Sequence, residues 1–454
     1  MGQLKRSLAV LAAVSSLLTA AADRAAQAQT APAAPAGNLE QEYDAAFQEM
    51  LKQPANLDVL FKFATLASQT GDLEGAVSAL ERMLLINPDL PRVRLELGVL
   101  YFRLGSFEVA RTYLEAALKT PNLPPEVRER AEKFMAEVQA RQNPSRFTGD
   151  FFLGWRYQTN ANLGPSGSTV RLFGQSANLN QASSGQADWG VVGSMQIRHT
   201  YDLGRQDKSQ LESTLTAYAS RQFQVQTANV SLIDFTSGPR FQAFQGIFED
   251  VTLKPFGTIG QIWVYDTPYY GSYGAGLEGT VLVTDRLRNM SNFVFRRHNH
   301  TDKWYLPNNS TYRGMEYSGT TAFQHQLSSL VTLFLSGTGT RFEADATPIQ
   351  SYELWGTTVG FSFRFPDPLF KSNLPWAINL TYTYQWWRYD APDPTVDPDV
   401  QRRQLDSILN LVLSVPFDDR TTFSLSGGRF IRSSNLPNYA FNNNNVMFGI
   451  SWRF

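Results

Sequence analysis

The side chains that most often bind metals or act as nucleophiles are scarce in this chain. It has no cysteine and four histidines, His199, His298, His300 and His325. His298 and His300 would lie on one side of an extended segment, a spacing that can hold a metal ion. Because no third ligand lies near them in the sequence, we expect a solvated pair in or beside a loop. The sequence therefore predicts no metal site and no cofactor.

The sequence motifs that usually support nucleophilic catalysis are also missing from the chain. The chain contains no Gly-x-Ser-x-Gly element, no His-x-Ser-Asn-type element and no cysteine nucleophile. Asp150, Glu212, Asp406 and Arg429 fall in alternating segments, and we interpret them as charges of a polar interior rather than general acids. The chain is therefore not expected to be an enzyme. Its net charge of −1 gives no support for a nucleic-acid partner.

The last nine residues of the chain have the pattern of a β-strand with one apolar face. Side chains of a strand alternate between its two faces. One face here is apolar and ends on Trp452 and Phe454, whereas the other carries Met447, Gly449, Ser451 and Arg453. This pattern is typical of the closing strand of an outer-membrane β-barrel. Trp452 and Phe454 are also the expected insertion signal, which implies the barrel-assembly machinery as a partner.

Similar alternation recurs through residues 146–454. We place about fourteen strands there, joined alternately by short turns and by long loops at 160–186, 298–309, 390–400 and 433–443. The mean hydropathy of −0.28, together with 18 Tyr and 9 Trp, suits a barrel with aromatic girdles in outer-membrane lipid. A soluble β-sandwich is disfavoured because it would not expose wholly apolar faces.

Residues 38–143 show a helical pattern with a period of 34 residues. Gly71 and Gly105 are 34 apart, as are Ala76 and Ala110, which is tetratricopeptide spacing. A concave face of such repeats binds peptides or proteins; the alternative is a spacer with no ligand. The expected client-binding groove is lined by Asp58, Phe61, Thr65, Arg92, Leu95, Val99 and Phe102.

The N-terminal region predicts export. Residues 1–28 have the basic start, short apolar run and small residues of a secretory signal peptide, and residues 29–37 form an Ala/Pro-rich linker. The predicted fold class is α + β: a periplasmic α-helical tetratricopeptide-repeat domain (38–143) followed by an antiparallel transmembrane β-barrel of about 14 strands (146–454). The protein would then lie in the outer membrane, with the repeat domain in the periplasm.

Several short motifs follow one another along the predicted barrel. An Asn-x-Asn-x-x-Pro turn opens the barrel, and a Gly-Pro-Arg-Phe run and an Arg-x-x-x-Asp run follow before the terminal Trp-Arg-Phe. The motif residues are Asn160, Asn162, Pro165, Gly238, Pro239, Arg240, Arg402 and Asp406. In this order, the motifs resemble those of the barrel in the surface lipoprotein assembly modifier (Slam) family. Family membership would imply a repeat domain that receives a client protein, and a barrel that moves the client to the cell surface. Clients in that family are surface lipoproteins or secreted proteins.

Three functions remain open at this point. The leading hypothesis is a Slam-like translocon whose repeat groove captures the client. The second is an exopolysaccharide exporter, which also joins helical repeats to a barrel and would favour carboxylates and aromatic platforms in the lumen. The third is a diffusion porin with an accessory periplasmic domain.

Overall fold

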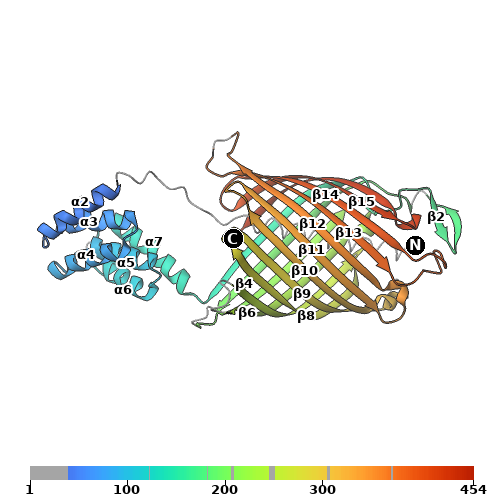
Figure 1. Ribbon diagram of the computed structural model, residues 1–454, viewed down its shortest axis with the longest axis horizontal. Coiled ribbons are helices and arrows are strands. Elements are labelled where there is room, and N and C mark those ends of the chain that lie inside the picture. The colour runs from blue at the N-terminus through green and yellow to red at the C-terminus, as the bar shows by residue number, and fades with distance from the viewer. Residues whose placement is uncertain are drawn as a thin grey trace. The chain divides into compact units, whose positions relative to one another are not determined.

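The computed structural model describes residues 39–121, 123–180, 183–205, 209–244, 251–303, 307–369 and 372–454. The predicted signal peptide (1–28) and linker (29–37) lie outside these ranges. Two compact units meet in the chain between Pro144 and Ser145. The helical unit and the barrel are both visible in Figure 1.

The first unit consists of antiparallel helices, each packed against its neighbours in the chain. Gly71 caps the end of one helix with φ 95°, and Gly105 adopts φ 77° at the equivalent point 34 residues later. A positive φ is readily adopted only by glycine, so these turns follow directly from the sequence. The described helices are α2 (Leu39–Lys52), α3 (Leu57–Thr70), α4 (Leu73–Ile86), α5 (Pro91–Arg103), α6 (Phe107–Leu118) and α7 (Pro125–Gln142).

Small residues allow these helices to approach one another closely. Ala76 and Ala110 are completely buried. A Cβ atom at Gly98 on α5 would lie 2.6 Å from Cγ of Leu114 on α6, so only glycine fits at this crossing. The repeat spacing seen in the sequence therefore marks the helix contacts of the core.

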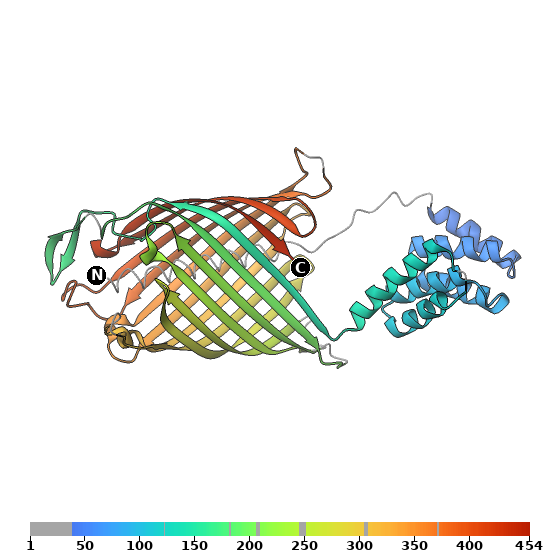
Figure 2. The same ribbon diagram turned by 180° about the vertical axis from the view of Figure 1, so that it is seen from behind.

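The second unit is a closed antiparallel barrel of fourteen strands (Figures 1 and 2), as predicted. Each barrel strand pairs with the next barrel strand along the chain, and β1 closes the barrel against β16. Within the part of the barrel that the structure describes, no strand edge is left unpaired, which is what a sheet needs in lipid. The barrel strands are β1 (Ser145–Gln158), β4 (Asp188–Asp202), β5 (Gln210–Gln222), β6 (Val230–Ala243), β7 (Val251–Val264), β8 (Thr267–Thr284), β9 (Leu287–His300), β10 (Gly314–Gln326), β11 (Val331–Ala344), β12 (Tyr352–Phe365), β13 (Trp376–Tyr389), β14 (Arg403–Pro416), β15 (Thr421–Ser434) and β16 (Phe441–Arg453).

Exposure along the strands identifies the face that meets lipid. On β16, Val446, Phe448 and Trp452 are 52, 48 and 44% exposed, and Phe448 stacks on outward-facing Trp155 of β1 at 5.6 Å. The intervening residues Met447 and Gly449 point inward. The alternation predicted for the closing strand is thus confirmed. None of the described helices is long and apolar enough to span a membrane.

Connections differ between the two ends of the barrel. The long segments 159–187, 301–313 and 390–402 all lie at the end opposite the start of β1, which we call the loop end; the other is the turn end. The predicted loop 433–443 is shorter than expected, because β15 continues to Ser434 and β16 begins at Phe441. The first loop contains a hairpin that alternation did not predict, formed by β2 (Thr169–Leu172) and β3 (Gln175–Asn178).

Candidate functional site

Strand register settles which of the predicted interior charges face the lumen. Asp150, Glu212 and Asp406 share the inward face of their strands, as expected. Arg429 does not: it pairs with outward-facing Leu409 and is itself exposed. The expectation for Arg429 was wrong, since β15 carries charges on both faces. Arg429 lies an even number of positions from the apolar residues Phe423 and Leu425. Strand alternation would therefore have placed it on the outward face.

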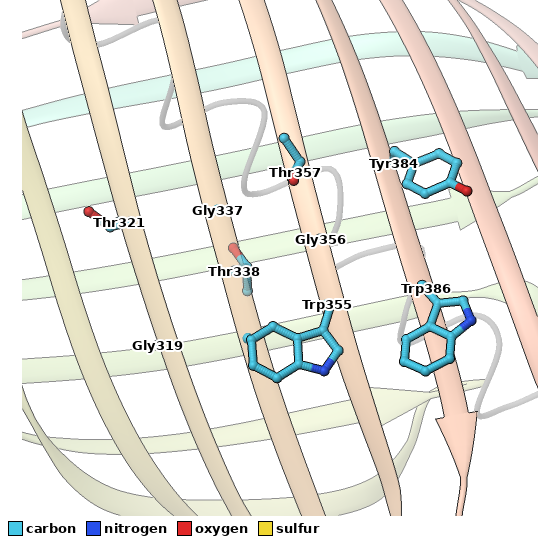
Figure 3. A pocket seen from close by; sticks show the side chains of 10 residues that line it. Gly319, Thr321, Gly337, Thr338, Trp355, Gly356, Thr357, Tyr384 and Trp386 are labelled. Atoms are coloured by element: carbon cyan, nitrogen blue, oxygen red, sulfur yellow. The ribbon is translucent and has the colours of Figure 1, made fainter.

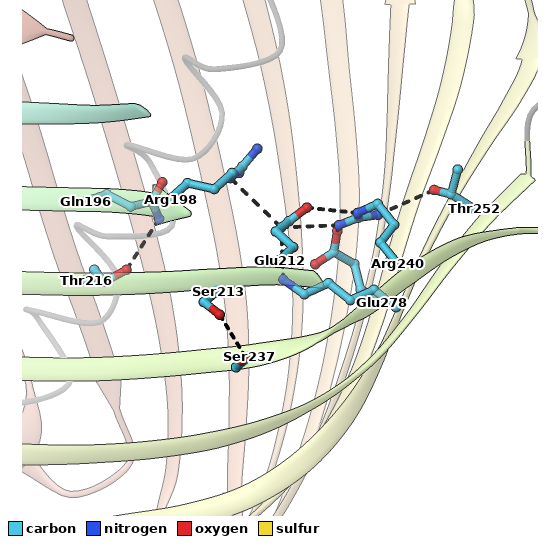
Figure 4. A network of polar contacts seen from close by, with 10 residues as sticks. Gln196, Arg198, Glu212, Ser213, Thr216, Ser237, Arg240, Thr252 and Glu278 are labelled. Atoms are coloured by element: carbon cyan, nitrogen blue, oxygen red, sulfur yellow. Dashed lines mark hydrogen bonds and ion pairs between the residues drawn. The ribbon is translucent and has the colours of Figure 1, made fainter. Parts of the chain in front are cut away.

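Near the turn end, a buried carboxylate gathers three cations on the lumen side (Figure 4). Glu212 accepts hydrogen bonds from Nε of Arg240 at 2.9 Å and from Nζ of Lys254 at 2.9 Å. Arg198 lies 3.9 Å from the same carboxylate, and Arg240 also pairs with Glu278. Glu212 and Lys254 are 5 and 3% exposed. Ions this deeply buried need one another, so the four strands β5–β8 are held in register here.

The Gly-Pro-Arg motif supplies this cluster. A Cβ at Gly238 would lie 2.0 Å from the carbonyl oxygen of Pro255, so β6 and β7 approach too closely for any other residue. Pro239 pairs opposite Leu211, and Arg240 follows on the inward face. The motif therefore brings Arg240 against Glu212. Lys254 and Glu278 were missed by sequence reasoning because only the pairing of β6, β7 and β8 brings them there.

At the loop end, a second buried ion pair faces the lumen. Arg432 donates to Asp406 through Nε at 2.6 Å and Nη2 at 2.5 Å, and Trp387 donates its indole N–H at 3.1 Å. The two charged side chains are 2 and 1% exposed. The guanidinium also lies over the rings of Trp387, Phe430 and Phe441 at 5.4–5.6 Å. Asp406 thus anchors three strands, β13, β14 and β15.

Arg402, the first residue of the Arg-x-x-x-Asp motif, is held between two tyrosine rings. Its guanidinium carbon lies 3.9 Å from the ring centre of Tyr389 and 3.7 Å from that of Tyr439. It also donates to the hydroxyl of Tyr389 at 2.7 Å. Such stacking suits arginine and not lysine. Arg402 therefore fastens the end of the loop 390–402 to Tyr389 of the barrel wall and to Tyr439.

The two histidines of the predicted loop pair are part of the barrel wall. His298 and His300 end strand β9 and are 9 and 4% exposed. Tyr270 lies 4.7 Å from the ring of His298 and 4.6 Å from that of His300. The expectation of a solvated pair was wrong, because pairing with β8 extends β9 to His300. Among the residues that the structure describes, no three His, Asp or Glu side chains lie close enough to hold a metal ion.

The Asn-x-Asn turn fastens the first loop to the seam between β1 and β16. Asn160 accepts from the N–H of Gly164 and donates to its carbonyl, both at 2.8 Å, and its backbone N–H donates to Asn443 at 3.0 Å. Asn162 accepts from the N–H of Gln186 and donates to the Ser184 carbonyl, at 2.8 and 2.9 Å. Pro165 is half-buried just beyond this turn.

The turn end of the same seam is covered by the predicted insertion signal. Phe454 exchanges two backbone hydrogen bonds of 3.0 Å with Gly149, and its ring occupies the space above that glycine, where a Cβ would lie 2.5 Å from Cζ. Trp452 stacks on Phe454 at 5.2 Å. The terminal aromatics thus help to close the barrel, in addition to the insertion role predicted for them.

All seven residues of the predicted groove lie on the first helices of the repeats, α3 and α5. Arg92 on α5 lies over the ring of Phe61 on α3 at 5.3 Å, so these two side chains are brought together. Asp58 and Thr65 are exposed on α3. The remaining three residues, Leu95, Val99 and Phe102, lie on α5.

These three differ in what they offer to a ligand. Leu95 is 1% exposed and packs in the core with Leu114, so it cannot contact a ligand. Val99 is half-buried, and Phe102 packs against Phe107 and Phe134. A groove as predicted would therefore lack Leu95.

The comparisons with known proteins match the two units of the chain to different proteins. Residues 64–136 match the tetratricopeptide repeat family. No curated protein sequence matches the chain. Among solved structures, a Pseudomonas aeruginosa FadL homologue is 10% identical over 70% of this chain and 93% of its own, with a TM-score of 0.37. A loop-deletion mutant of OmpT, an outer-membrane protein of Vibrio cholerae, is 7% identical over 68% and 99%, with a TM-score of 0.36. The Yersinia enterocolitica type III secretion chaperone SycD, in complex with a peptide of the translocator YopD, is 15% identical over 23% and 94%, with a TM-score of 0.19.

The chain thus combines a tetratricopeptide unit with a closed barrel of outer-membrane type. The barrel has an apolar outer wall, a lumen lined by charged clusters and an even number of strands. These are the structural features of a transmembrane β-barrel of the outer-membrane type.

Proposed function

We propose that this protein is an outer-membrane translocon: its repeat unit receives a client protein in the periplasm, and its barrel delivers the client to the cell surface. The observation that carries the proposal is the junction of the two units. The last helix ends at Gln142 and the first barrel strand begins at Ser145. The repeat unit is therefore joined to the first barrel strand by only two residues, Asn143 and Pro144.

The repeat unit supports this proposal through the chemistry of its first helices. An extended peptide is recognised by a few apolar contacts combined with charges that fix its direction. Phe61 with Arg92 above it, and Asp58 and Thr65 beside it, offer that combination. Val99 and Phe102 would extend the face, whereas Leu95 supports it from the core.

The barrel residues that resemble the Slam family support the finer part of the proposal. Each has a defined place in the barrel: Arg240 in the cluster near the turn end, Arg402 and Asp406 under the loops, and Asn160 and Asn162 at the seam between β1 and β16. We propose that the client is a surface lipoprotein or a secreted protein, as in that family. Because no ATP is present in the periplasm, folding of the client outside the cell would give the transport its direction.

The polysaccharide exporter is the weaker candidate because the aromatic rings described below, which face the lumen, are buried. Sugar transport needs aromatic faces open to the passing chain. Phe342, Trp387 and Tyr389 are 5, 3 and 5% exposed, and they stack on one another through Tyr352 at 5.1–5.5 Å. These rings fill the wall and offer no open platform. A porin is distinguished by conductance, since it would stay open in a planar bilayer whereas a translocon would be mostly closed.

The decisive experiment is site-specific photo-crosslinking in the native envelope. A photoreactive phenylalanine analogue replaces Phe61, which is half-buried on the proposed client face. The matched control places it at Thr112, which is exposed on α6, a second helix of the repeat. We expect one or two exported proteins to crosslink at Phe61 and not at Thr112.

Deletion of residues 38–143 provides the functional test. The barrel should still insert, as judged by heat-modifiable mobility on gels, while display of the crosslinked client is lost. Unchanged display of that client would refute the translocon. Crosslinks to enzymes of polysaccharide synthesis would instead favour the exporter.

A further inference from the structure

Four neighbouring strands carry a row of charges on their outward face, close to the loop end. Register places Arg341 of β11 opposite Glu353 of β12, Glu353 opposite Arg388 of β13, and Arg388 opposite Arg403 of β14. All four side chains lie on the same face of their strands as the lipid-facing residues. The row therefore lies where the apolar band of the barrel ends and polar headgroups begin.

Two of these arginines are left without a counter-charge. Arg341 is bound by Asp390, with N–O distances of 2.8 and 2.6 Å, and lies 3.5 Å from Glu343. The guanidinium groups of Arg388 and Arg403 have neither an ion pair nor a hydrogen bond within the described parts of the chain, and Glu353 pairs with neither of them. Like charges directly opposite each other destabilise a sheet. An anion from outside the protein would relieve this repulsion.

Next to the charged row, on the side away from the loop end, the lipid-facing wall has a hollow. Figure 3 shows the residues that line this hollow. It has a volume of about 560 Å³. Trp355, Trp386 and Tyr384 form its aromatic sides, and its floor consists of glycine and threonine. The remaining residues that line it are Gly319, Thr321, Gly337, Thr338, Gly339, Gly356 and Thr357.

The hollow and the charged row form one continuous surface. Trp355 and Glu353 are two residues apart on the same face of β12, as are Trp386 and Arg388 on β13. Two residues along a strand span about 7 Å. A second hollow of about 480 Å³ is lined by Arg341, Glu353, Arg388, Asp390 and Gln401. An occupant with an anionic head and a hydrocarbon chain would fill both hollows at once.

We propose that this surface, which we call the lipid site, binds a phosphorylated, acylated lipid of the leaflet at the loop end. Phosphate suits the pair of arginines, because guanidinium groups bind it through two parallel hydrogen bonds. The acyl chain lies in the glycine-floored hollow between the tryptophans. Charge favours this lipid over the acyl anchor of a lipoprotein client, which carries no phosphate. The lipid site is independent of the proposed translocation and stands whether or not a client is found.

Native mass spectrometry of the full-length protein in detergent tests this assignment, with bis-phosphorylated lipid A as the probe. R388Q/R403Q removes the unpaired charges, and R286Q, in an exposed turn at the other end of the barrel, is its control. G337L places a leucine side chain in the hollow, at a position where a Cβ meets nothing within 4 Å. The control G427L lies on the outward face of β15, where a Cβ also meets nothing within 4 Å.

We expect R388Q/R403Q and G337L each to reduce the bound fraction at least fivefold, and the two controls to leave it unchanged. Lipid A with both phosphates removed should bind the wild type at least fivefold less. Equal binding by all variants, or by the dephosphorylated lipid, would overturn the proposal. Full competition by inorganic phosphate, together with normal binding to G337L, would overturn it in favour of a simple anion site. Heat-modifiable mobility confirms that each variant is folded.

Discussion

Asp406→Ala tests the strongest single prediction about the barrel wall. Asp406 accepts three hydrogen bonds, two from Arg432 and one from Trp387, and both charged side chains are almost completely buried. Removing the carboxylate leaves the guanidinium of Arg432 without an anion and the indole N–H of Trp387 without an acceptor. Both groups stay in place, because Arg432 is enclosed by aromatic rings.

The magnitude follows from the burial of the pair. Removing one partner of a buried ion pair costs about 3–5 kcal/mol, because the other charge remains uncompensated. We therefore expect Asp406→Ala to lower the free energy of unfolding by about 3 kcal/mol. Replacing both partners by apolar residues, Asp406→Leu with Arg432→Met, should cost less than Asp406→Ala alone.

Urea unfolding of the purified protein in detergent micelles, followed by tryptophan fluorescence, measures this loss. Asp150→Ala is the matched control: its pair with Arg453 on the lumen side is 42 and 53% exposed, so the change should cost at most about 1 kcal/mol. If Asp406→Ala cost no more than Asp150→Ala, the reasoning from burial would be refuted.

Three further predictions concern other parts of the chain. The hydrogen bond to Glu81 raises the pKa of Tyr101 from 10.0 to about 12, so the stability that it adds is complete below pH 10 and is lost between pH 10 and 12. Tyr101→Phe should lower helix stability below pH 10 by about 1 kcal/mol and flatten this pH dependence, as followed by circular dichroism at 222 nm. Asn160→Ala leaves both backbone groups of Gly164 unpaired and should increase proteolysis of the first loop several-fold. Deletion of Phe454 should reduce the amount of folded barrel in the outer membrane several-fold.

Each of these has its own control and contradicting result. For Tyr101→Phe, an unchanged slope of stability between pH 10 and 12 would contradict the role of Glu81. Ser168→Ala, at an exposed position of the same loop, should leave proteolysis unchanged, and an equal rate in Asn160→Ala would show that Asn160 does not hold the loop. Phe417→Ala, in a turn where Phe417 is 73% exposed, should not affect assembly; if deletion of Phe454 also had no effect, its proposed signal role would fail.

The fold was largely predictable because strands and helices have different hydrophobic periods. On the outer face of the barrel, apolar residues meet lipid regardless of their cross-strand partners, so alternation alone identified about fourteen strands and the outward face of β16. In the repeat unit, Gly71 and Gly105 marked the period, because their positive φ is readily adopted only by glycine. The hairpin β2–β3 was missed, since it packs onto other loops and carries no alternation of its own.

Site residues were predicted less well, because a site is made of neighbours across strands. Asp406 was expected in the lumen, but its partner Arg432 is 26 residues away and is found only through the register of β14 and β15. His298 and His300 were expected in a loop because their own residue types favour no strand. Pairing with β8 overrides that preference.

The sequence by itself determined the two units, their order, the strand periodicity and the scarcity of catalytic residues. These depend on local patterns, which the chain carries whether or not it is folded. Only the tertiary structure decided which charges meet: Glu212 with Lys254, Asp406 with Arg432, and Arg388 beside Arg403. The reason is the closure of the barrel, which fixes the register of every strand and so brings residues from distant segments onto one small area of its wall.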